Sequence, residues 1–121
     1  IPEDFDTTLE FLDELKVPMV FMSVLTPRVG TRIRKQFEQE GRIIEHDPSV
    51  FGMEKVIYKP KNMTPAELEE NIWRTNRRFY SIPSIARRVL FKKRMWYSNI
   101  LLSNLYFVYG AHKRISPVMY Y

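Results

Sequence analysis

MVFMSVLTPRVGTRIRKQFEQEG, residues Met19–Gly41, is the stretch that carries most information about the fold. Its first part, Met19–Leu25, is almost continuously apolar and β-prone, which is typical of a strand covered on both faces in a parallel sheet. A Pro/Gly turn over Thr26–Thr31 follows. Arg32–Gly41 then has the spacing of a short amphipathic helix ended by glycine. We therefore expect one βα unit here.

One βα unit cannot complete a parallel sheet, because parallel strands need crossover neighbours. Since the chain also begins at Ile1, we expect it to be the C-terminal piece of a larger protein. Residues 53–58 predict one further strand. Helices are expected over residues 7–16, 64–80 and 98–111, with another beginning at residues 81–84. The expected fold class is α+β and predominantly helical: the end of a partial (β/α) barrel, residues 1–45, followed by a helical C-terminal domain, residues 46–121.

Composition excludes several classes of protein. With 121 residues, 45% hydrophobic and 14% aromatic, the chain is not of the disordered type. It contains no cysteine, which excludes disulfides, zinc–thiolate sites, thiol nucleophiles and a self-contained iron–sulfur ligand set. The first 15 residues are acidic and do not resemble a signal peptide, so we expect a cytoplasmic protein.

Charge is distributed unevenly along the chain. The net charge is +5, but residues 1–70 carry all 14 acidic side chains and a net charge of −5, whereas residues 71–121 carry +10. Such asymmetry suggests a surface for nucleic acid, a membrane or an acidic partner. It is equally compatible with a basic tail that docks on an acidic face of its own parent protein.

The turn that follows the expected strand is the first candidate site. In α/β sheets and barrels, ligands bind at the C-terminal ends of parallel strands. Gly30 allows close approach of a ligand to the backbone, and Thr26 and Thr31 offer hydroxyl groups beside Pro27. The simpler interpretation is a loop that needs proline and glycine for its own geometry.

Two blocks of sequence resemble a known family. Leu25–Thr31, with Glu40–Ile43 behind it, is similar to the Thr-Pro-x-Pro-Gly-Thr segment of radical S-adenosylmethionine enzymes of the cobalamin-binding-domain type. Tyr58–Leu68, followed by Arg78–Ser81, resembles the strand–loop–helix that opens the C-terminal accessory region of one branch of these proteins. The resemblance covers roughly residues 9–90 and implies that the first block follows a late strand of a partial barrel.

The resemblance implies a radical S-adenosylmethionine, iron–sulfur oxidoreductase-like parent that holds an iron–sulfur cluster and S-adenosylmethionine. It leaves open whether that parent uses cobalamin. This chain has Val29 where the family has a proline, so we expect a less rigid loop. Because the chain lacks the family's cysteine run, the resemblance implies a non-catalytic region, inert alone, that helps close the active site or guide substrate to it. The implied cofactor or substrate wall consists of Thr26, Pro27, Gly30 and Thr31. Lys59 and Lys61 are candidates to steer an anionic substrate.

A basic cluster in the C-terminal half is the second candidate site. The candidate ligands for an anion are Arg74, Arg77, Arg78, Arg87 and Arg88. Three of them share one helix face at i, i+3 and i+4 spacing, and neighbouring aromatics offer stacking surfaces for bases. We therefore keep a basic helical binding module for nucleic acid or an anionic membrane as an alternative function. The simpler interpretation is a solvated helix face, since the aromatics fall at core spacing.

The segment Met95–His112 has no formal charge and is rich in leucine and aromatic residues. It suggests either contact with an anionic membrane surface or a closing helix buried against the rest of the parent chain. An exposed strand or this apolar helix would also allow self-association. His46 and His112 stand alone, so we expect no metal site and treat both as turn or surface residues.

Overall fold

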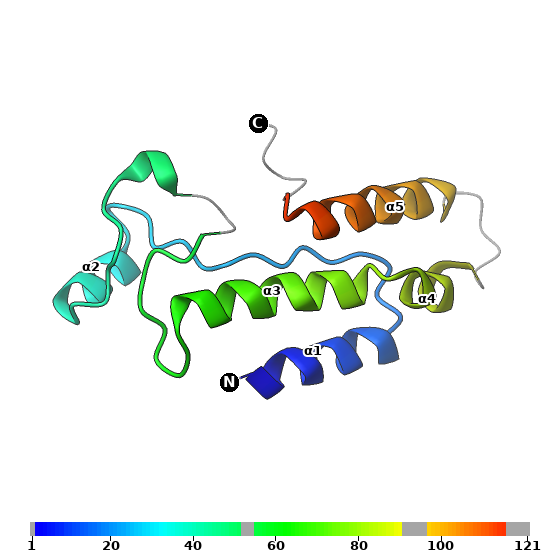
Figure 1. Cartoon of the computed structure of the whole chain (residues 1–121), viewed down its shortest axis with the longest axis horizontal. Coiled ribbons are helices and arrows are strands. Elements are labelled where there is room, and N and C mark those ends of the chain that lie inside the picture. Colours follow the sequence, from blue (N-terminus) through cyan, green and yellow to red (C-terminus); the bar gives the residue numbers. More distant parts are fainter. Residues whose placement is uncertain (1, 52–54, 91–96, 116–121) are drawn as a thin grey trace. The chain divides into compact units, whose positions relative to one another are not determined.

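The computed structural model describes residues 2–51, 55–90 and 97–115. These residues form five α-helices, a 3-10 turn and a π-helical turn, and they contain no strand (Figure 1). The predominantly helical character is therefore confirmed. The elements are α1 (Pro2–Glu14), α2 (Arg32–Gln39), η1 (Pro48–Val50), α3 (Pro65–Phe79), α4 (Ile82–Ile85), η2 (Ala86–Leu90) and α5 (Tyr97–Lys113).

The expected βα unit is present only as its helix, α2. Met19–Leu25 runs as irregular chain and joins no β-ladder within the described residues, because this part of the chain offers it no parallel neighbour. The second expected strand lies partly outside the described residues, at 53 and 54. Its remainder contributes one isolated antiparallel bridge, between Ile43 and Tyr58.

The chain packs as two compact units. The first unit comprises residues 23–72, and the second comprises residues 2–22 together with residues 73–121. These packing units do not follow the expected division at residue 45. Helix α3 contributes its first part to one unit and its last part, from Trp73 on, to the other.

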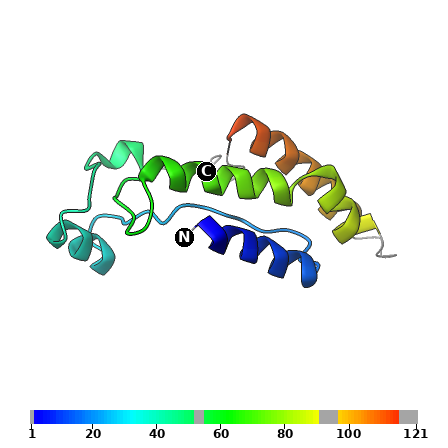
Figure 2. The ribbon, with the colours of Figure 1, turned by 60° about the horizontal axis from the view of Figure 1, so that its bottom comes forward.

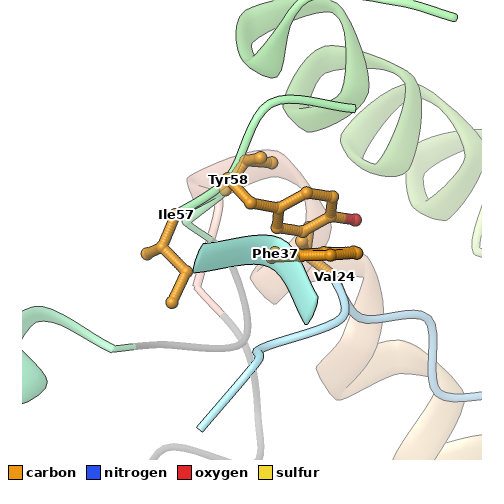
Figure 3. Packing of buried hydrophobic residues seen from close by; sticks show 5 residues of the cluster. Val24, Phe37, Ile57 and Tyr58 are labelled. Carbon is orange, nitrogen blue, oxygen red and sulfur yellow. The ribbon is translucent and has the colours of Figure 1, made fainter. Parts of the chain in front are cut away.

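A small hydrophobic core holds the first unit together. The core comprises Val24, Phe37, Val56, Ile57 and Tyr58. The rings of Phe37 and Tyr58 lie 5.0 Å apart, and Val24 lies beside them (Figure 3). Each fully buried side chain of this kind contributes about 1.5–3 kcal/mol. This core therefore fixes the segment before the Thr26–Thr31 turn against the segment around Tyr58.

Local capping chemistry sets the start of α3 as the sequence predicts. The Glu67 carboxylate accepts a hydrogen bond of 2.6 Å from the Thr64 backbone N–H, and Thr64 Oγ1 accepts one of 3.2 Å from the Glu67 N–H. This reciprocal pair is a capping box. The helix expected to begin at residue 7 begins earlier: α1 starts at Pro2, and Thr7 Oγ1 donates to the Glu3 carbonyl within it. Proline and an acidic first turn favour that earlier start.

Aromatic packing organises the second unit. Leu9, Phe79 and Tyr80 form its buried cluster. The ring of Phe107 on α5 stacks on that of Tyr80, with centroids 4.8 Å apart and planes 15° apart. Tyr80 also donates its hydroxyl to the Val20 carbonyl at 2.5 Å. The extended segment after α1 is therefore held by both α5 and the end of α3 (Figures 1 and 2).

Candidate functional sites

The Thr26–Thr31 turn is shaped by its own backbone requirements. Gly30 has φ +86°, a conformation that disfavours other residues, and no heavy atom lies within 4 Å of a Cβ built there. Thr31 is the N-cap of α2: its Oγ1 accepts from the Arg34 N–H at 3.3 Å and donates to the Arg28 carbonyl at 2.6 Å. Pro27 is fully buried. These contacts account for Pro27, Gly30 and Thr31 by the geometry of the loop itself. This is what the simpler interpretation predicts, and it requires no ligand.

The loop that carries Lys59 and Lys61 lies in the same unit. Both lysines are exposed. The Lys59 backbone is fixed by Arg42, whose carbonyl accepts from the Lys59 N–H at 2.7 Å and whose Nε donates to the Lys59 carbonyl at 2.8 Å. The Arg42 guanidinium also stacks on the Phe37 ring, 4.2 Å from its centroid. The loop is thus anchored on the core, and its two cations face solvent.

A buried arginine that the sequence analysis did not single out stiffens this unit. Arg34 on α2 is only 3% exposed. It bonds Glu38 Oε1 through Nε at 2.6 Å, and its Nη2 lies 3.2 Å from Nδ1 of His46. Because Arg34 directly follows Ile33 in the sequence, the hydrophobic periodicity of this helix did not indicate that Arg34 is buried. His46 therefore has a structural partner, in agreement with the expectation of a turn residue.

In the second unit, the basic side chains surround a pocket of about 360 Å³. The pocket lies beside α1, the last turns of α3, α4 and η2. Its basic lining consists of Arg74, Arg77, Arg78 and Arg87, and its only acidic lining residue is Asp13. The structure thus brings four of the five expected arginines to one place.

Helix α1 supplies carboxylates to these arginines. Asp6 pairs with Arg78 through Oδ1 and with Arg74 through Oδ2, the latter at 3.8 Å. Asp13 accepts from Arg87 at 2.8 Å. The sequence analysis did not pair Asp6 and Asp13 with any base. Their spacing of seven residues, which places them on one face of a helix, is the signal that identifies them.

Arg88 departs from the sequence expectation. It was expected on the outer face with Arg87, but it is 2% exposed. Its guanidinium lies 3.6 Å from the centroid of the Phe79 ring and donates to the Phe79 carbonyl at 2.6 Å. Burial lowers the pKa of Arg88, while the Asp13 carboxylate acts in the opposite direction. Because protein carbonyls occupy its donors, Arg88 supports the fold.

Two further expectations concern metals and membranes. Among the described residues, no three His, Asp or Glu side chains lie close enough together to hold a metal ion. His112 on α5 is exposed, and its Nδ1 contacts the Val108 carbonyl at 2.9 Å. None of the helices within residues 2–51, 55–90 and 97–115 combines the length and the apolarity that a membrane crossing requires. The first residues of the apolar segment, 95 and 96, lie outside the described part.

No known protein family, curated protein or solved structure matches this chain.

Proposed function

We propose that this chain is the non-catalytic C-terminal region of a radical S-adenosylmethionine enzyme of the cobalamin-binding type. In this proposal the catalytic parts, which hold the iron–sulfur cluster and S-adenosylmethionine, belong to the preceding part of the parent protein. The chain contributes to closure of the active site or to substrate access. The proposal rests on the resemblance of two sequence blocks to that family.

One observation supports reading the two blocks together. Residues 25–43 and residues 58–68 lie in one compact unit and share one hydrophobic core. The backbone connects them as well: the Ile44 N–H donates to the Ile57 carbonyl at 3.0 Å, and Lys59 and Arg42 bond each other. Two family-like segments that are about thirty residues apart are thus parts of a single small structural element. A chance resemblance of either block alone would not require this packing.

The proposed role follows from what each segment presents to solvent. The Thr26–Thr31 turn is fixed by the buried Pro27 and by the Thr31 cap, so it forms a stiff wall. The neighbouring loop presents the cations of Lys59 and Lys61. A stiff wall with nearby positive charge suits the rim of an opening that admits an anionic substrate.

The parent protein provides the decisive test. Its coding sequence upstream of Ile1 should encode a Cys-x₃-Cys-x₂-Cys run within βα repeats. The anaerobically purified parent should show the broad visible absorption of a four-iron cluster and should release 5′-deoxyadenosine from S-adenosylmethionine. A parent sequence without that cysteine run would show that the proposal is wrong.

A pair of substitutions that removes two positive charges tests the rim. In the parent, Lys59→Gln with Lys61→Gln should raise KM for an anionic substrate at low salt, and the difference from wild type should shrink as salt screens the charges. Arg32→Gln with Lys35→Gln removes the same charge from exposed positions on α2 and serves as the control. An equal KM in the two double variants would remove the steering role of the lysines.

The alternative proposal is a basic module for nucleic acid or an anionic membrane. The pairing of Asp6 and Asp13 with three arginines weakens it, because part of the basic surface already has carboxylate partners within the chain. This pairing favours the interpretation that basic and acidic segments of the protein dock on each other.

A further inference from the structure

We infer that the arginine-lined pocket of the second unit binds a phosphate group, either a phosphomonoester or inorganic phosphate. The inference is independent of the proposed radical enzyme. The pocket is formed wholly by residues of one packing unit, and its volume of about 360 Å³ exceeds tenfold the ~30 Å³ that one water occupies in the liquid. It is therefore large enough for a phosphate with part of the molecule that bears it.

The charges around the pocket favour a multiply charged anion. Four guanidiniums line it against the single carboxylate of Asp13, and Asp6 lies just outside the lining. A phosphomonoester carries about −1.5 to −2 at neutral pH, which suits a lining of this composition.

One carboxylate is shared between two of the arginines. Asp6 divides its two oxygens between Arg74 and Arg78, and the Arg74 contact is long at 3.8 Å. Guanidiniums that lie next to one another bind phosphate oxygens in pairs of parallel hydrogen bonds.

The existing ion pairs are weak enough to yield to a ligand. The side chains of Arg74, Arg78 and Arg87 are 42%, 56% and 65% exposed, so their pairs with α1 are solvent-screened. Arg88, the next residue after Arg87, does not share this freedom, because its side chain is 1% exposed. An incoming phosphate thus competes with Asp6 and Asp13 for the exposed arginines.

Titration of the 121-residue chain with inorganic phosphate at constant ionic strength tests the inference, with chloride as the reference anion and amide chemical shifts as the readout. We expect saturable shifts at Ser81 and Ser84, which line the pocket. Arg77→Gln with Arg78→Gln should weaken binding at least tenfold. Arg32→Gln with Lys35→Gln, on α2 and outside the pocket, carries the same change in net charge and should bind as wild type does.

A third variant moves binding in the opposite direction. Asp6→Asn removes the carboxylate that competes for Arg74 and Arg78, so it should bind phosphate several-fold more tightly, although it loses two ion pairs. An arginine cluster that served the fold alone would give Asp6→Asn no such gain. Circular dichroism of each variant checks that the helices persist.

The source of the phosphate is distinguished by two further probes, glycerol 3-phosphate and phosphatidylcholine vesicles with or without phosphatidic acid. Binding of glycerol 3-phosphate without vesicle binding indicates a soluble phosphomonoester. Pocket-dependent binding to the phosphatidic acid vesicles alone indicates a lipid headgroup. Equal weakening in the pocket and α2 double variants, or no saturable shift with any probe, would overturn the inference.

Discussion

Replacement of Arg88 by methionine should be among the most destabilising single changes in the second unit. The Arg88 guanidinium donates to the Val17, Pro18 and Phe79 carbonyls at 2.9, 3.0 and 2.6 Å, and its Nε donates to Ser84 Oγ at 3.3 Å. Methionine fills much of the same space but donates nothing. Three carbonyl oxygens would then lose this donor inside the unit.

The magnitude follows from those contacts. A buried polar group left unsatisfied costs about 1–3 kcal/mol, and removing one partner of a buried charge pair costs about 3–5 kcal/mol. Since the Arg88–Asp13 pair is long at 3.8 Å and Asp13 is partly exposed, we expect Arg88→Met to lower the free energy of unfolding by about 3–5 kcal/mol in total. That is about a fifth or more of the ~5–15 kcal/mol that stabilises a typical domain.

Urea unfolding followed by circular dichroism measures this loss. With slopes of about 1–3 kcal/mol per molar urea, the midpoint should fall by more than about 1 M. The neighbouring Arg87→Met is the matched control: the same charge is lost, but from a side chain that is 65% exposed, so the expected cost is about 0–1 kcal/mol. Arg88→Lys should fall between the two, because one ammonium cannot reach acceptors in several directions.

Equal effects of the two substitutions would show that this account of Arg88 is wrong. If Arg88→Met and Arg87→Met lowered the midpoint equally, the contacts of Arg88 would contribute no more than an exposed ion pair, and its assignment as the buried support of this unit would be wrong.

Three further outcomes are expected. Thr64→Ala removes the capping box and should cost about 1 kcal/mol, seen as lower stability in urea, whereas Thr64→Ser should keep most of it; equal losses in both would contradict the cap. Gly30→Ala should cost about 1–2 kcal/mol from backbone strain alone, since no atom crowds that position, and Gly41→Ala at φ +63° should behave alike; a much larger loss at Gly30 would indicate a steric role. Burial raises the pKa of Tyr80, so the folded state resists ionisation of the phenol and stability should decrease as pH rises above about 10; Tyr80→Phe should show a shallower decrease, measured by thermal unfolding from pH 8 to 11.

Local chemistry made part of this structure predictable. The start of α3 at Pro65 follows from Thr64 and Glu67, which are three residues apart and cap the helix without help from elsewhere. The helix after the Gly30 turn was expected from its amphipathic spacing and from the glycine that ends it. In contrast, whether residues 19–25 form a strand depends on neighbours that lie elsewhere in a protein, so an apolar run alone could not decide it.

In the candidate sites, the sequence specifies which side chains carry charge. It also places Arg74, Arg77 and Arg78 at a spacing that puts them on one helix face. Only the tertiary structure decided that Asp6 meets Arg78 across 72 residues, and that Arg87 faces solvent while Arg88 is buried. The sequence places Arg88 one helical turn after Ser84, so the two residues share a helix face. The charge of Arg88 nevertheless favoured an exposed position in the prediction. The cost of burying a charge is met by acceptors from distant segments, and only the folded chain brings these together.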